Sequence, residues 1–180
     1  RSGTTVASRP RRVLRGNPWG EIAIHEAAHA WMLRRNGIAV VEATLVCPDV
    51  DTVRGGVTAN GIVDTLSAVA GVAAEGWFFG KPLEARRLNA KDRSFIPKEK
   101  RKVSPSYLGI RMIGPSEFHD DELIEREMRR AYDLIGKNAH VVRALADALK
   151  RKKRITGQQI DEIISRETGP QIPRCAMSRA

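Results

Sequence analysis

Residues 24–30 of this 180-residue chain read Ile-His-Glu-Ala-Ala-His-Ala. On a helix, positions i and i+4 lie one above the other on one face, so His25 and His29 can both present ring nitrogens to one metal ion. Glu26 lies about 100° around the helix, within reach of a water held by that ion. Zinc lowers the pKa of such a water to about 7, and a neighbouring carboxylate can take its proton. The pattern is typical of a metal-dependent peptidase.

The flanking sequence predicts that this motif lies on one buried helix, from about residue 18 to residue 36. Asn17-Pro18 is a favourable start, because Asn accepts a backbone N–H and Pro at the first position loses no hydrogen bond. Asn36-Gly37 is a favourable stop, since both residues tolerate the left-handed conformation. The positions around the motif are small and apolar, and buried histidines need polar partners, which a metal ion supplies. Zn²⁺ is the expected cofactor, and iron, cobalt or nickel would accept the same ligands.

The composition predicts one globular domain with a short tail at each end. We expect a flexible basic segment over 1–16, the domain over 17–166 and a flexible tail over 167–180. No apolar run is long enough for a membrane span. Two cysteines, Cys47 and Cys175, are too few for a disulfide framework, which favours reducing, cytoplasmic surroundings.

The strongly basic charge raises a separate hypothesis. The formal net charge is +10, and basic residues gather over 9–15, 98–102 and 150–154. Such runs can bind nucleic acid through its phosphates. Aromatic residues make up only 5% of the chain, so base stacking has few partners, and no nucleic-acid-binding motif is present. A basic nucleic-acid-binding protein therefore stays an alternative, and no specific nucleic-acid partner is expected.

The rest of the sequence predicts a mainly α fold with a small β-sheet, in the α+β class. Strands are expected over 38–46 and 57–59, with a turn-rich loop over 47–56 between them, and helices over 63–79, 120–135, 139–150 and 156–166. Gly80 and Gly136 are expected to end the first two of these helices, and Thr156 to cap the last. The charged, proline-containing segment 81–116 is expected to hold only short helices.

Three stretches of the chain carry a resemblance to one known family. Residues 25–30 read His-Glu-Ala-Ala-His-Ala, residues 70–75 read Ala-Gly-Val-Ala-Ala-Glu before Phe79-Gly80, and helical stretches follow over 131–149 and 155–164. In order, these resemble the HEAGHA motif, the GGRAAEE helix and the C-terminal helices of the FtsH family of zinc metallopeptidases. The resemblance covers residues 19–165. It implies a zincin-like HExxH helix with a C-terminal helical bundle, and zinc-dependent endopeptidase activity.

The resemblance also implies a third metal ligand, because the family takes an aspartate that follows the second motif. Asp92, 17 positions after Glu75, lies close to that spacing. Asp120 and Asp121 are rival candidates, since they open a helix whose N-terminus favours a carboxylate. Glu75 is a third rival, but we interpret it as the acceptor that orients a ligand histidine. The expected site has metal ligands His25, His29 and Asp92 and the catalytic base Glu26.

Departures from the family pattern shape the expected activity. The chain contains no GxxxxGK[ST] phosphate-binding loop, so the resemblance implies a stand-alone, ATP-independent relative of the protease domain. Its polypeptide substrates are then expected to be flexible or already unfolded. The strand over 38–46 is a candidate for pairing with an extended peptide. Ala28 and Gly76 stand where the family has a glycine and a second acidic residue. Ala28 and the weak pattern around the third ligand keep open a catalytically degenerate metal- or peptide-binding protein of the same fold.

Overall fold

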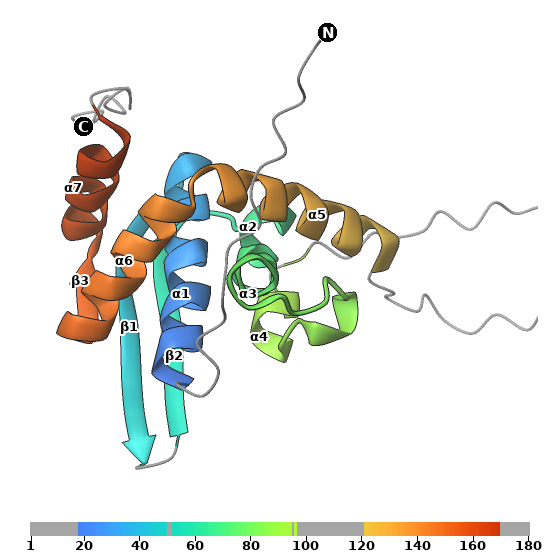
Figure 1. Ribbon diagram of the computed structural model, residues 1–180, viewed down its shortest axis with the longest axis horizontal. Helices are drawn as coiled ribbons and strands as arrows, with labels where there is room; N and C mark the ends of the chain where they lie inside the picture. Colours follow the sequence, from blue (N-terminus) through green and yellow to red (C-terminus); the bar gives the residue numbers. More distant parts are fainter. Residues whose placement is uncertain (1–17, 50–51, 95, 97–120, 170–180) are drawn as a thin grey trace, which may run out of the picture.

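The computed structural model describes residues 18–49, 52–94, 96 and 121–169. Its elements are α1 (Pro18–Arg35), β1 (Ala39–Asp49), β2 (Thr52–Asn60), α2 (Thr65–Ala68), α3 (Ala70–Phe79), the 3-10 turn η1 (Ala85–Arg87), α4 (Ala90–Ser94), α5 (Asp121–Lys137), α6 (Ala139–Lys152), β3 (Arg154–Thr156) and α7 (Gly157–Thr168). The fold is mainly helical with one three-stranded antiparallel sheet, so the predicted α+β class is confirmed (Figure 1). The predicted N-terminal segment 1–16, the predicted cap Asn17 and residues 170–180 of the predicted tail lie outside the described residues.

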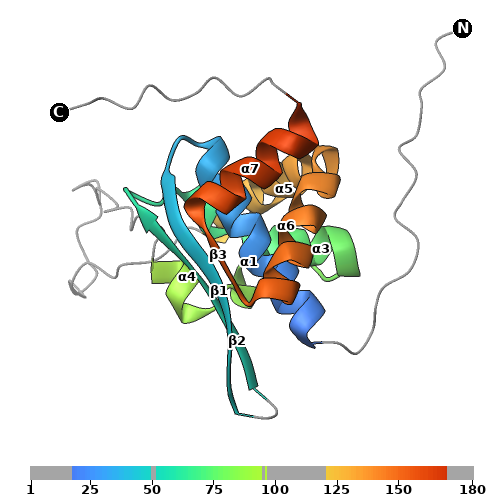
Figure 2. The ribbon, with the colours of Figure 1, turned by 90° about the vertical axis from the view of Figure 1, so that its left-hand side faces the viewer.

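The motif helix α1 lies at the centre of the fold. It packs against β1 and β2 and also against α3 and α6 (Figures 1 and 2). Its alanines, including Ala23, Ala27 and Ala30, are fully buried, and so is Met32. Small side chains let the neighbouring elements approach the helix closely, so the backbone around the two histidines is fixed by packing on several sides.

β1 is the middle strand of the sheet, because β2 pairs along one edge and β3 pairs with Glu42–Thr44 on the other. The sequence did not predict β3, and an extended peptide cannot pair with β1 over Glu42–Thr44, where β1 already has a neighbour on each side. The predicted loop over 47–56 is wrong, since β1 continues to Asp49 and β2 begins at Thr52. Figure 2 shows the resulting long hairpin extending past the helices. Gly55, read as part of a turn, instead pairs with Leu45 inside the strand.

The predicted helix over 63–79 is divided into α2 and α3, which meet at Val69. Gly80 ends α3 in the left-handed conformation, as predicted, with a φ of 67°. Gly136 does not end α5, which continues to Lys137. A Cβ on Gly136 would lie 2.7 Å from the Trp77 ring, so this glycine permits close packing of α5 on α3 rather than a turn.

The C-terminal helices complete the core. Thr156 caps α7, and its capping box with Gln159 confirms the predicted helix start. Arg34 Nε donates to Asp161 Oδ1 at 2.6 Å, which joins the end of α1 to α7. Within the described residues, the helices lack the combination of length and apolar character that a membrane span requires.

Of the three basic runs, only residues 150–154 are described. Lys150 pairs with Asp147 at 2.9 Å, and Arg154 pairs with Glu42. Lys153 Nζ lies 3.6 Å from the centroid of the Trp19 ring. Part of this run is therefore engaged within the protein, at the end of α6 and in β3. The other two runs, 9–15 and 98–102, lie outside the described part of the chain.

Candidate metal centre

The two motif histidines meet at one point beside α1. Their ring centroids are 4.7 Å apart, and the Nε2 atoms of His25 and His29 lie 3.0 Å from each other. Both side chains are largely buried, with 12% and 10% of their surface exposed. The helical i, i+4 spacing therefore brings two imidazole nitrogens together, as the sequence predicts.

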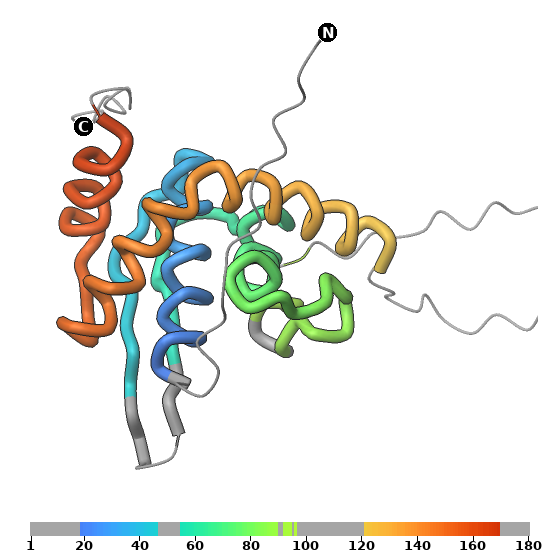
Figure 3. The backbone as a smooth tube through the Cα atoms, viewed as in Figure 1, coloured from blue at the N-terminus to red at the C-terminus, as the bar shows by residue number. Residues whose placement is uncertain are grey.

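Asp92 completes the group from a distant segment. The chain turns back after α3, passes through η1 and enters α4, which carries this aspartate (Figure 3). Asp92 Oδ2 lies 3.2 Å from His25 Nε2 and 3.6 Å from His29 Nε2. One ligand atom of each residue lies within 4.8 Å of the other two, so these three residues can hold a metal ion. Asn89 fixes the carboxylate, since its amide nitrogen donates to Asp92 Oδ2 at 2.7 Å.

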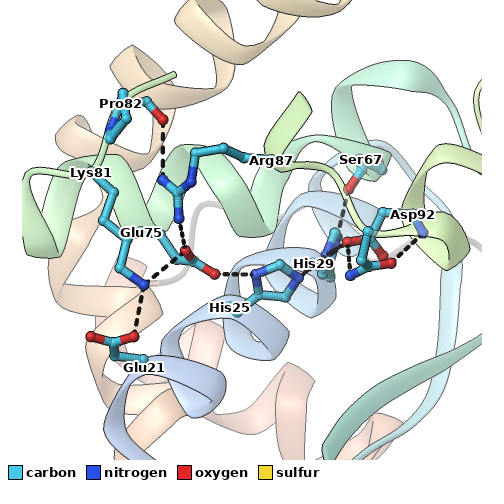
Figure 4. A network of polar contacts seen from close by, with 10 residues as sticks. Glu21, His25, His29, Ser67, Glu75, Lys81, Pro82, Arg87 and Asp92 are labelled. Carbon is cyan, nitrogen blue, oxygen red and sulfur yellow. Dashed lines mark hydrogen bonds and ion pairs between the residues drawn. The ribbon is translucent and has the colours of Figure 1, made fainter. Parts of the chain in front are cut away.

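The hydrogen bonds of the two Nδ1 atoms determine the tautomer of each histidine ring, and so whether Nε2 carries a proton. His29 Nδ1 lies 2.8 Å from the carbonyl oxygen of Ser67, and His25 Nδ1 lies 2.9 Å from Glu75 Oε1 (Figure 4). A carbonyl and a carboxylate only accept, so both Nδ1 atoms donate a proton. In the neutral rings both Nε2 atoms are then bare lone pairs, aimed at each other and at Asp92. A divalent ion placed between these three atoms could accept all three lone pairs at once.

Without a metal ion, the same group of residues favours holding a proton. Burial lowers the pKa of His25, but hydrogen bonds with Asp92 and Glu75 and the charges of Glu26 and Asp92 outweigh it and raise this pKa to about 10. Burial raises the pKa of Asp92, but its hydrogen bonds with the two histidines hold it well below its ordinary range. A positive charge between these residues is therefore strongly favoured.

Glu26 lies beside the histidines, on the side of α1 that faces β2. A Cβ on Gly55 would lie 2.5 Å from Glu26 Oε1, so the strand passes directly against this carboxylate. Glu26 is 9% exposed, and within the described part of the chain no hydrogen bond or ion pair engages its oxygens. Its charge acts on the adjacent His25, and a carboxylate so placed can accept a proton from a nearby water.

The structure separates the candidates for the third ligand. Asp92 lies against both Nε2 atoms, whereas Glu75 contacts the outer nitrogen Nδ1 of His25. Asp121 pairs with Arg93 at 3.6 Å and is not part of the group, and Asp120 lies outside the described residues. Glu75 thus occupies the position of an acceptor that orients a ligand histidine.

Two glycines and several polar partners of the site were not identified from the sequence. A Cβ on Gly71 would lie 2.4 Å from Cε1 and Nε2 of the His25 ring, and Gly55 makes the equivalent space for Glu26. The β-branched residues around Gly55 are a signal that favours a strand over a turn. Ser67 gave no signal, because it acts through its backbone carbonyl.

No family model matches this sequence, and no curated protein matches it. We therefore infer function from the side chains themselves. Two imidazoles and a carboxylate converge from α1 and α4, and the buried Glu26 follows His25 in the motif helix. Nitrogen and oxygen ligands in this number suit a catalytic metal site with a coordination position left open.

Proposed function

We propose that this protein is an ATP-independent, zinc-dependent endopeptidase. The observation that carries the proposal is the convergence of His25 Nε2, His29 Nε2 and Asp92 Oδ2 within 4.8 Å, on the helix that also carries the buried Glu26. Zinc is preferred because it binds imidazole and carboxylate well and takes three protein ligands in catalytic sites. The resemblance of the motifs to the FtsH family supports the same assignment.

Each residue has a chemical role in this proposal. His25, His29 and Asp92 hold the ion, which when bound polarises the scissile carbonyl and acidifies a water. Glu26 takes a proton from the attacking water and later gives it to the leaving amine nitrogen. Glu75 and the Ser67 carbonyl keep both imidazoles in the tautomer whose Nε2 is bare.

The polypeptide substrate is proposed to bind along β2. In the described sheet β2 pairs with β1 alone, so its other edge has backbone N–H and C=O groups to offer. Gly55 lies within β2 and directly against Glu26, so a peptide paired along that edge runs close to the catalytic base. Pairing through the main chain needs an extended substrate, which suits flexible or unfolded polypeptides without ATP-driven unfolding.

The decisive experiment compares wild type with Glu26→Gln. Wild type loaded with zinc is expected to cleave unfolded casein and to lose the activity when the metal is chelated. Glu26→Gln should bind zinc with nearly the same affinity but cleave at least about 100-fold more slowly, because it lacks the general base. Glu162→Gln, an exposed glutamate on α7, is the matched control and should cleave like wild type.

Three results would count against the proposal. Equal cleavage by Glu26→Gln and wild type would exclude Glu26 as the base. Wild type that binds one zinc ion but cleaves neither casein nor short flexible peptides would be a metal-binding protein without peptidase activity. Salt-sensitive DNA binding by a protein that takes up no zinc would favour the basic nucleic-acid-binding alternative.

A further inference from the structure

The Glu75 carboxylate contacts both the candidate metal centre and two positively charged side chains, those of Lys81 and Arg87. Its Oε1 accepts from His25 Nδ1 at 2.9 Å. Its Oε2 accepts from Lys81 Nζ at 3.1 Å and from Arg87 Nη2 at 2.6 Å (Figure 4). The two oxygens therefore have separate tasks, because the cations occupy one and leave the other to the imidazole.

The two cations are themselves held in place. Lys81 Nζ also donates to Glu21 Oε2 at 2.7 Å, which connects α3 to the first turn of α1. Arg87 Nη1 donates to the carbonyl oxygen of Pro82 at 3.1 Å, within the segment that leads from α3 to α4. The side chains of Glu75, Arg87 and Lys81 are 16%, 22% and 31% exposed, so this cluster is less solvated than an ordinary surface ion pair.

The two histidines differ in what orients them. His29 donates to a backbone carbonyl, that of Ser67, which the helix α2 fixes. His25 donates to a side-chain carboxylate on α3, which can rotate about its own χ angles unless something holds it. Of the two histidines, His25 is therefore the one whose acceptor needs further residues to fix its direction.

We propose that Lys81 and Arg87 are positioning residues of the metal centre, which hold Glu75 so that Oε1 faces His25 Nδ1. This inference rests on the proposed metal site. Lys81 and Arg87 act through Glu75, since among the described residues their polar contacts are with Glu75, Glu21 and the Pro82 carbonyl. Their loss lets the carboxylate rotate or turn toward solvent, so His25 loses its fixed orientation and the ion is held less tightly.

The direction of the change in zinc affinity shows whether Lys81 and Arg87 act by holding Glu75 in place or only by their positive charge. Removing a positive charge near a bound cation reduces repulsion, so charge alone predicts tighter zinc binding in Arg87→Met or Lys81→Met. Positioning predicts weaker binding. We expect zinc affinity, measured by competition with a chromophoric chelator, to fall about tenfold in each variant and about 10- to 100-fold in Glu75→Gln.

A double-mutant cycle tests whether the cations act through Glu75. Once Glu75→Gln has removed the charged acceptor, adding Arg87→Met should change zinc affinity by less than about twofold. Arg86→Met is the matched control, since Arg86 is 82% exposed and pairs with Glu84 instead. Lys81→Arg keeps the charge and should restore most of the affinity. The visible spectrum of the Co²⁺-loaded variants should report a changed ligand geometry in Arg87→Met but not in Arg86→Met.

Stability is followed separately, by thermal unfolding of each metal-free variant, so that zinc affinity is compared among folded proteins only. Wild-type zinc affinity retained in folded Arg87→Met and Lys81→Met would overturn this inference and leave the proposed function intact. Additive losses in the Glu75→Gln background would overturn it too, because the cations would then act by another route. Failure of wild type itself to bind zinc would instead overturn the proposed function.

Discussion

The two halves of the candidate metal centre are built in different ways. The histidine half lies on α1, where packing on several sides fixes the backbone and buries alanines completely. The aspartate half lies on α4, a helix of five residues, where the Asn89 side chain holds Asp92 through two hydrogen bonds. The packed half is therefore sensitive to added volume, whereas the polar half is sensitive to the loss of single hydrogen bonds.

Adding volume to the packed half should have the largest effect. A Cβ on Gly71 would lie 2.4 Å from the His25 ring, so Gly71→Ala must displace the ring or separate α3 from α1. We expect zinc affinity to fall by at least about 100-fold. The free energy of unfolding should fall by about 1–3 kcal/mol, as for other overpacked sites. Chelator competition and urea unfolding measure the two quantities.

Gly20→Ala is the control for that variant, because a Cβ there meets nothing within 4 Å. It lies in the same helix as His25 and should gain up to about 1 kcal/mol from helix propensity while leaving zinc affinity unchanged. Equal zinc affinities in the two variants would show that close packing against the His25 ring is not required.

The next effect, about tenfold in zinc affinity for each pH unit, is expected from pH. The pKa of His25 in the metal-free protein is raised from 6.5 to about 10, chiefly by Asp92 and Glu75 against the effect of burial. A raised folded-state pKa contributes stability below about 6.5 that is lost as the pH rises towards 10. Zinc competes with the same proton, so its affinity should rise about tenfold per pH unit over this range.

Stability and zinc affinity should therefore change in opposite directions between pH 6.5 and 10. Urea unfolding with a chelator present measures the stability of the metal-free protein, and competition with a chromophoric chelator measures its zinc affinity. Towards acid, the pKa of Glu75, which burial raises but His25 and Lys81 lower to about 2, predicts a second loss of stability as the pH falls below about 4.5. A metal-free stability that stays constant from neutral to alkaline pH would contradict the proposed His25 environment.

Removing one hydrogen-bonding side chain from the polar half should have a smaller effect. Asn89 accepts from the Asp92 backbone N–H at 2.9 Å and donates to its carboxylate at 2.7 Å. Asn89→Ala should weaken zinc binding about tenfold and cost about 1 kcal/mol of stability or less. Asn138→Ala is the control, since the Asn138 side chain donates to the Leu134 carbonyl of α5, away from the candidate metal centre. Equal zinc affinities in these two variants would show that Asp92 needs no such support.

The sequence predicted the packed half better than the polar half, for a physical reason. The i, i+4 histidines and the stop at residues 36–37 are local signals, so α1 and its paired imidazoles follow directly from them. Asp92, Asp121 and Glu75 are all carboxylates that follow the motif in the sequence. The path of the chain between α3 and α4 decides that Asp92 meets Nε2 of His25 and that Glu75 meets Nδ1.

Glycine accounts for the main errors in the predicted elements. Gly55 and Gly136 were interpreted as turn and stop signals, but each lies inside an element and makes room for a large side chain, Glu26 or Trp77. A glycine required by a close tertiary contact looks the same in a sequence as one required by a turn. The sequence did not indicate β3 for a similar reason. Its three residues pair with β1 residues that are far away in the sequence, and a local pattern carries no information on such a pairing.

The smallest effect on zinc affinity is expected from Thr156→Ala, which lies far from the site. This variant should lower the stability of the fold without changing metal binding. The Thr156 side chain caps α7 in a capping box with Gln159, and α7 reaches α1 through the Arg34–Asp161 pair. The variant should lose about 1 kcal/mol of unfolding free energy and keep the zinc affinity of wild type. A parallel loss of both quantities would show that the histidine half depends on the stability of the whole fold rather than on the contacts of α1 with its immediate neighbours. The contrast between packed and polar halves would then be one of degree, because any destabilising change would loosen both.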